Sequence, residues 1–120
     1  MNKTILPEGF HIVKISRIYE GESEISKTPF FKCYFENEFG AIPQRFYIHP
    51  NSLIIIDRLF ETVGIEESCV DTKDLLNKEL VIKVRMDTDE EAKQNKDKKK
   101  YRKVVGYYKS IYLNKENEDI

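Results

Sequence analysis

The chain has 120 residues, of which 40% are hydrophobic and 34% charged, and its formal net charge is −1. This length suits one domain with a real core and excludes a second domain of ordinary size. No stretch approaches the roughly 18 consecutive apolar residues of a membrane span, and the N-terminal part lacks the apolar run of a signal peptide. We therefore expect a cytoplasmic protein with no membrane partner.

Residues 9–21 form the first predicted strand, because they are rich in β-branched and aromatic side chains and are bounded by glycines. Val13 and Ile15 suit one face of this strand, whereas Ile12 and Ile18 are in the other phase. One extra residue in a strand exchanges its two faces, so the pattern predicts a β-bulge or a sharp coil midway.

Residues 28–40 and 41–50 predict the second and third strands, joined by a short hairpin. In the second strand Phe31, Cys33 and Phe35 share one face, which we expect to point into the core. The opposite phase of the two strands combines cations with aromatic rings: Lys32, Tyr34, Arg45 and Tyr47, with His49 at the end.

Residues 51–65 change to a helical period, with Ser52 as the expected N-cap and Gly64 just past the end. The predicted apolar stripe of this helix consists of Leu53, Ile55, Ile56, Leu59, Phe60 and Val63. Residues 71–78 predict a further capped turn of helix, and Asn77 at its end suits a left-handed conformation.

Two more strands are predicted after this turn. Residues 79–87 alternate, with Leu80, Ile82, Val84 and Met86 inward and Val81, Lys83 and Arg85 outward. Residues 100–113 have apolar and aromatic side chains in both phases, so their facing stays open. Residues 114–120 form an acidic tail that we expect to be disordered.

The predicted fold is all-β with one main helix: a five-stranded OB-type Greek-key barrel over residues 1–113, with the helix between strands 3 and 4. Five short strands cover one another poorly as a flat sheet, whereas a closed barrel plugged by the helix hides both core and edges. An α+β open sheet with two helices on one face is the competing architecture.

Five blocks of the sequence carry a resemblance to a known family. Over about residues 5–111 they read LPEGFHIVKI, TPFFKCYFE, LFETVGI, NKELVIKVRMD and KYRKVVGYYKS. They resemble a family of phage- and prophage-encoded single-stranded-DNA-binding-like proteins, long catalogued as a domain of unknown function. The resemblance implies an OB-type fold and binding of single-stranded DNA in phage replication or recombination. Asn77 is a departure, since that family would have glycine at this helix exit.

The near-neutral total conceals a segregation of charge. Residues 1–91 carry 11 Lys and Arg against 17 Asp and Glu, whereas residues 92–109 carry eight against one. A local field of this kind steers charged ligands. The basic run joins the predicted fourth and fifth strands, where OB-folds use a long loop to bind oligonucleotides. It contains Lys93, Lys96, Lys98, Lys99, Lys100, Arg102 and Lys103.

We therefore expect a non-catalytic protein that binds single-stranded DNA through phosphate contacts and base stacking. The predicted groove consists of Lys32, Tyr34, Arg45, Tyr47, Lys83 and Arg85. The predicted clamp consists of Lys98, Lys99, Lys100, Tyr101, Arg102 and Lys103. Four or five phosphate contacts would give a salt slope of about −3 on single strands. A merely solvated hairpin tip is the alternative for the lysine run.

The acidic residues before the lysines do not suit a metal. Asp87, Asp89, Glu90 and Glu91 resemble the start of an EF-hand loop, but its sixth and twelfth positions would be Ala92 and Lys98. We expect these carboxylates instead to pair with the lysines when DNA is absent, which would sharpen the salt dependence of binding.

No catalytic or cofactor motif accompanies these features. His11 and His49 lack a metal-binding spacing, and the chain has no nucleophile elbow and no glycine-rich phosphate loop. Cys33 and Cys69 are expected to be reduced thiols, with a structural disulfide as the alternative.

Several questions stay open at this point. The rival function is an OB-like protein–protein interaction module, whose binding would be nearly indifferent to salt. RNA is the alternative to DNA, because the preference depends on contacts to the 2′-hydroxyl. The acidic tail either recruits replication or recombination proteins or is ordinary terminal disorder, and the oligomeric state is not readable.

Overall fold

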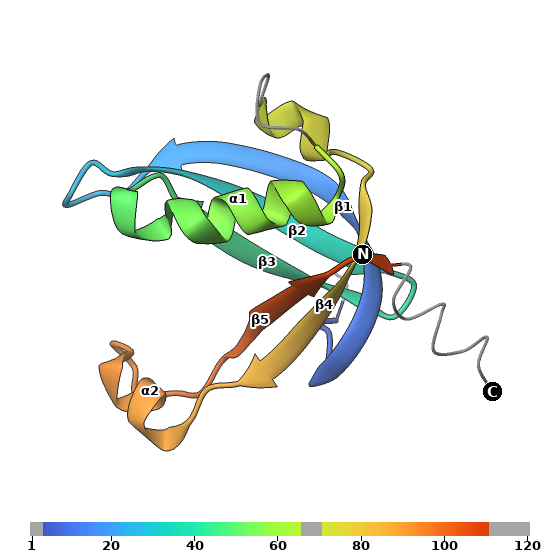
Figure 1. Cartoon of the computed structure of the whole chain (residues 1–120). Helices are drawn as coiled ribbons and strands as arrows, with labels where there is room; N and C mark the ends of the chain where they lie inside the picture. Colours follow the sequence, from blue (N-terminus) through green and yellow to red (C-terminus); the bar gives the residue numbers. More distant parts are fainter. Residues whose placement is uncertain (1–3, 66–70, 111–120) are drawn as a thin grey trace.

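The computed structural model describes residues 4–65 and 71–110 (Figure 1). Five strands, two α-helices and two short 3₁₀ turns make up this part of the chain. The strands are β1 (Gly9–Glu22), β2 (Pro29–Asn37), β3 (Gly40–Tyr47), β4 (Glu79–Met86) and β5 (Arg102–Tyr108). The helices are α1 (Leu53–Thr62) and α2 (Asp89–Gln94), and the 3₁₀ turns are Pro50–Ser52 and Thr72–Leu75.

The five strands form one antiparallel sheet in the order β3-β2-β1-β4-β5. The protein is thus mostly β with one main helix between β3 and β4, as the sequence predicted. The sheet is not closed into a barrel, however, because β3 and β5 are its two edge strands and do not pair with each other in the described chain. Figure 1 shows the sheet strongly bent, with α1 lying across it.

The sheet bends along β1, and the two halves of this strand pair with different neighbours. Its N-terminal half pairs with β4 and its C-terminal half pairs with β2. The predicted bulge lies between Ile15 and Arg17, where the register with β2 shifts. Because the extra residue exchanges the two faces, Val13 and Ile15 before the bulge and Ile18 after it all pack on the core.

The core lies between the concave side of the sheet and α1. In β2 the predicted inward residues Phe31, Cys33 and Phe35 are all buried, and Ile56 and Leu59 of α1 pack in the same cluster. Burial raises the pKa of the Cys33 thiol to about 12, so the thiol stays protonated at neutral pH. Cys69 lies outside the described residues.

Helix α1 departs in detail from its predicted stripe. Ile56, Leu59 and Phe60 are buried, but Leu53 and Ile55 are about half exposed, at 46% and 47%. The helix is only ten residues long, and Ile54 in its first turn is 73% exposed. Burial therefore begins at Ile56.

Both ends of α1 lie where the sequence predicted them, but the N-cap side chain makes no capping bond. Ser52 occupies the N-cap position but makes no side-chain cap bond. The capping is done one turn earlier, where His49 Nδ1 accepts from the Asn51 amide at 3.2 Å and begins the 3₁₀ turn. At the other end Gly64 has a φ of +80°, which closes the helix as expected for glycine.

Strand β4 follows its predicted alternation at most positions, although Met86, which was expected to point inward, is half-buried and lies outside the core cluster. Leu80, Ile82 and Val84 are buried in the core, and Asn77 before the strand has the expected left-handed φ of 65°. Val81 was expected to point outward to solvent, yet only 3% of it is exposed, although it lies outside the core cluster. Its cross-strand neighbour Tyr108 lies beside it on that face.

The segment between β4 and β5 is a second correction. The sequence predicted a plain loop or hairpin tip, whereas residues 89–94 form α2. Thr88 and Glu91 make a capping box, in which each side chain accepts a bond from the other residue's backbone amide. A short ordered helix therefore carries the acidic residues.

The last predicted strand is shorter than expected, ending at Tyr108, and residues 111–113 and the tail 114–120 lie outside the described residues. Within the described part of the chain, no helix is long and apolar enough to cross a membrane.

Candidate functional site

Three rows of residues cross the outer face of β1, β2 and β3, the face turned away from the core. The cross-strand register aligns Arg17 with Tyr34 and Pro43, Tyr19 with Lys32 and Arg45, and Gly21 with Phe30 and Tyr47. These nine positions hold three cations and four aromatic rings and no carboxylate. We call the set Arg17, Tyr19, Phe30, Lys32, Tyr34, Arg45 and Tyr47 the aromatic–basic face.

Each cation of this face lies against a ring. The Arg17 guanidinium carbon is 4.5 Å from the centroid of the Tyr34 ring. Lys32 Nζ lies 5.2 Å from Tyr34 and 5.7 Å from Tyr19, so it sits between two rings. These distances are typical of cation–π contacts, which hold the charges close to the aromatic surface.

Arg45 connects this face to the edge of the sheet. Its guanidinium carbon lies 4.5 Å from the Phe30 ring, and its Nη1 is 3.5 Å from the Tyr47 hydroxyl. Phe30 is buried beneath these neighbours, whereas Tyr19 is 60% exposed. Gly21 leaves room for the Phe30 ring to pack against the sheet, because a Cβ at position 21 would come within 3.0 Å of the Phe30 ring.

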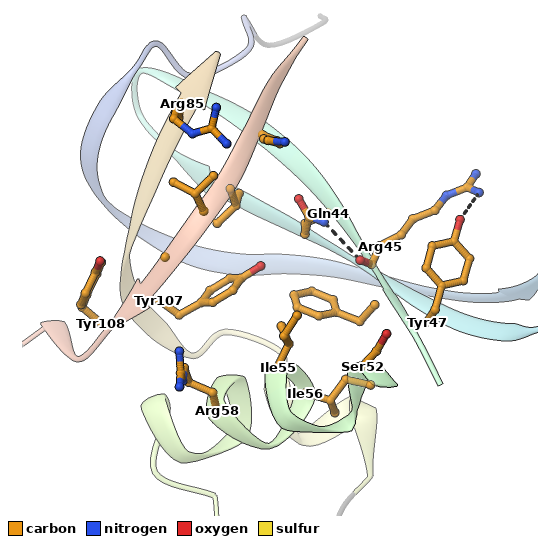
Figure 2. A pocket seen from close by; sticks show the side chains of 15 residues that line it. Gln44, Arg45, Tyr47, Ser52, Ile55, Ile56, Arg58, Arg85, Tyr107 and Tyr108 are labelled. Carbon is orange, nitrogen blue, oxygen red and sulfur yellow. Dashed lines mark hydrogen bonds between the residues drawn. The ribbon is translucent and has the colours of Figure 1, made fainter. Parts of the chain in front are cut away.

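A groove of about 540 Å³ separates the two edge strands β3 and β5 (Figure 2). Phe46, Ile56 and Tyr107 supply apolar surface, and the Tyr107 ring packs 5.7 Å from the Phe46 ring. The cations along the groove are Arg45, Arg58, Arg85 and Lys103. Figure 2 shows Arg58 on α1 at one end and Arg85 at the other, with Tyr107 directed into the space between them.

Two cations of the predicted clamp form ion pairs with carboxylates in or just before α2. Lys100 Nζ is 2.6 Å from Asp89, and Lys103 contacts both Asp87, at 3.5 Å, and Glu91. The expected pairing with lysines is thus confirmed for Asp87, Asp89 and Glu91, whereas Glu90 makes no ion pair among the described residues. Hydrogen bonds from Arg85 and Lys103 hold the pKa of Glu91 well below its usual range.

The other clamp residues also have internal partners. Lys98 has a left-handed φ of 60° and donates to the Lys93 carbonyl, and Arg102 donates to the Ile5 carbonyl at 2.8 Å. The Tyr101 hydroxyl donates to Asp97. Lys99 is the one predicted clamp cation whose side chain makes no ion pair or hydrogen bond among the described contacts, although its backbone does.

The predicted groove residues do not form one surface. Lys32, Tyr34, Arg45 and Tyr47 do lie together on the aromatic–basic face. Arg85 lies instead at the far end of the groove between β3 and β5. Lys83 belongs to a third place, the outer face of β4, where its Nζ is 5.4 Å from the ring of Phe10.

Sequence reasoning missed Arg17, Tyr19 and Phe30. Arg17 and Tyr19 follow the bulge, so their facing depends on the position of the extra residue, which the sequence predicted only approximately. The signal was present, because Arg17 and Tyr19 alternate with the inward Ile18. Phe30 shares the phase of Lys32 and could have been included on that ground.

Within residues 4–65 and 71–110 no group of three His, Cys, Asp or Glu side chains is placed to hold a metal ion. Comparison with known proteins finds no family model and no curated protein that matches the chain.

Proposed function

We propose that this protein binds single-stranded DNA without catalysing a reaction, and that the aromatic–basic face is the principal binding surface. The observation that carries the proposal is the set of nine carboxylate-free positions on β1, β2 and β3, which holds three cations and four aromatic rings. Binding single strands without sequence preference needs cations that follow the phosphates and rings on which bases stack.

The exposed rings determine how much base stacking contributes to the free energy of binding. Tyr19 and Tyr47, at 60% and 38% exposed, offer ring surface to a base, and each stacked base contributes about 1–3 kcal/mol. Lys32 and Arg45 lie next to these rings, so a base on a ring would bring its phosphate within reach of a cation. Two stacked bases thus contribute about 2–6 kcal/mol, and the phosphate contacts add to this.

The strand order supports an OB-type fold as the finer description. A chain that pairs as β3-β2-β1-β4-β5, with a helix between β3 and β4, has the order of a five-stranded Greek-key barrel left open between its third and fifth strands. In that fold the face of strands 2 and 3, together with neighbouring loops, binds oligonucleotides. The proposal is supported by the location of the aromatic–basic face on β1, β2 and β3, and by the α2 segment (residues 87–101) that joins β4 to β5.

The biological setting follows only from the resemblance seen in the sequence. We propose phage or prophage replication or recombination as that setting. DNA is preferred to RNA in this proposal for the same reason, and a comparison of oligothymidine with oligouridine measures the preference directly.

Fluorescence anisotropy tests the proposal. A labelled oligothymidine of about 16 nucleotides is titrated with the protein at about 50 mM and about 200 mM salt. We expect binding that weakens several-fold to tens-fold between the two, with a log–log slope of about −3 if four or five phosphates are contacted. Folded protein that fails to bind at the lower salt concentration contradicts the proposal.

An apolar strip favours a second candidate function, a protein–protein interaction module. Ile48, Leu53, Ile54 and Ile55 surround the start of α1 and are 48%, 46%, 73% and 47% exposed. A partner bound through such side chains would be held by apolar burial, so its affinity would hardly change with salt. Salt dependence therefore separates the two candidates.

A further inference from the structure

Glu91 is the centre of a cluster of charges between α2 and the end of the groove. It accepts two hydrogen bonds from the Arg85 guanidinium, at 2.8 and 3.3 Å, and it contacts Lys103 Nζ. All three side chains are about one-third exposed, at 34%, 37% and 35% for Glu91, Arg85 and Lys103. The cluster is therefore reachable from solvent.

Arg85 and Lys103 also line the groove between β3 and β5. A carboxylate and a phosphate bind a guanidinium through the same pair of parallel N–H groups. While Glu91 occupies that edge of Arg85, a phosphate entering the groove has to displace it. The two cations nearest to this end of the groove are thus already engaged by the protein's own carboxylate.

We propose that Glu91 is an internal competitor of nucleic acid, which holds Arg85 and Lys103 away from phosphate and so weakens binding until a bound strand displaces it. This inference rests on the proposed function, because the competing ligand is the phosphate of a single strand. The segment between β4 and β5, which contains α2, then inhibits binding at the site. Its acidic residues set the affinity, and its lysines contribute fully only after the exchange.

Glu91 has a structural role as well, which the test has to keep intact. Its carboxylate accepts from the Thr88 amide as half of the capping box of α2. Glutamine serves this position in a capping box as well as glutamate does. Glu91→Gln therefore removes the charge that holds Arg85 and Lys103 but retains the cap.

Glu90 provides a matched control. It is the neighbouring residue on the same helix, it is exposed, and it makes no ion pair among the described residues. Glu90→Gln changes the net charge by the same amount as Glu91→Gln without releasing either cation. A difference between the two variants therefore isolates the release from the general gain in positive charge.

The experiment measures oligothymidine binding of wild type, Glu91→Gln and Glu90→Gln by anisotropy over a range of salt. We expect Glu91→Gln to bind at least about 5-fold more tightly than Glu90→Gln.

The outcomes separate the two proposals. If wild type binds and the two variants have equal affinity, the competition is overturned while the proposed function stands. If none of the three binds, both proposals fail. Should Glu91→Gln not fold, the Arg85 side-chain Nε–H resonance of wild type replaces it: movement on adding oligothymidine supports the exchange, and an unmoved resonance in DNA-bound protein overturns it.

Discussion

Replacing Tyr19 by alanine is the most informative single change to the aromatic–basic face. Tyr19 lies in the middle row of the face, beside Lys32, and is 60% exposed. Its ring is thus the most accessible of the four, and little packing depends on it. The loss of one stacked base should weaken the free energy of DNA binding by about 1–3 kcal/mol, which is about a 5- to 150-fold loss of affinity.

Stability should change much less than binding in this variant. A substitution at an exposed strand position changes the free energy of unfolding by no more than about 1 kcal/mol, through β-propensity and cross-strand contacts. Tyr19→Phe separates the ring from its hydroxyl and should bind like wild type. Phe39→Ala is the matched control, because Phe39 is an aromatic residue with 71% exposure in the β2–β3 turn, away from the face.

The assay is oligothymidine anisotropy at about 50 mM salt, with a thermal melt of each variant alongside. The reasoning is refuted if Tyr19→Ala binds like wild type, or if Phe39→Ala loses as much affinity. Loss of binding in Tyr19→Phe equal to that in Tyr19→Ala would instead point to a hydrogen bond of the hydroxyl.

Three further predictions concern stability and reactivity. Phe35→Ala removes a fully buried side chain of β2, so it should lower the free energy of unfolding by about 3–5 kcal/mol and lower the denaturation midpoint markedly. A decrease below about 1 kcal/mol would contradict the assigned core. In a Cys69→Ser background, Cys33 should resist alkylation until the protein unfolds, since its pKa is raised to about 12; fast labelling of folded protein, followed by mass spectrometry, would show that it is not buried. The pKa of Glu91 is lowered in the folded state, so its contribution to stability is present above the usual value of 4.5 and is lost as the pH falls below it. Melting temperatures between neutral pH and pH about 3 should therefore fall less in Glu91→Gln than in wild type, and equal slopes would exclude the ion pairs as the cause.

The sheet was predictable where a local pattern decided the structure. The strict alternation of Phe31, Cys33 and Phe35 placed β2 correctly, because side chains in a strand alternate between faces regardless of distant contacts. The change of phase between Ile15 and Ile18 required an extra residue, and the bulge is there.

The closure of the sheet was not predictable in the same way. Whether β3 and β5 pair depends on the spacing of two edges that are far apart in sequence, and no local pattern reports it. The groove between them, with Tyr107 and Phe46 in it, therefore could not be anticipated. The facing of β5 stayed open for the same reason, since both of its phases carry apolar side chains.

Helix α2 was missed although one signal of it was visible. Only Ala92 of this helix is buried, so an apolar period could not indicate it. The sequence from Thr88 to Glu91 does match the pattern of a capping box, which predicts a helix start. That pattern would have predicted a helix that begins after Thr88.

The most direct test of the central claim is a map of the residues that contact the nucleic acid. Two-dimensional amide NMR spectra of the labelled protein are recorded while unlabelled oligothymidine is added. We expect the largest shifts on β1 after the bulge, on β2 and on β3, at Arg17, Tyr19, Lys32, Tyr34, Arg45 and Tyr47. Shifts confined to the start of α1, or no shifts with folded protein at low salt, would contradict it.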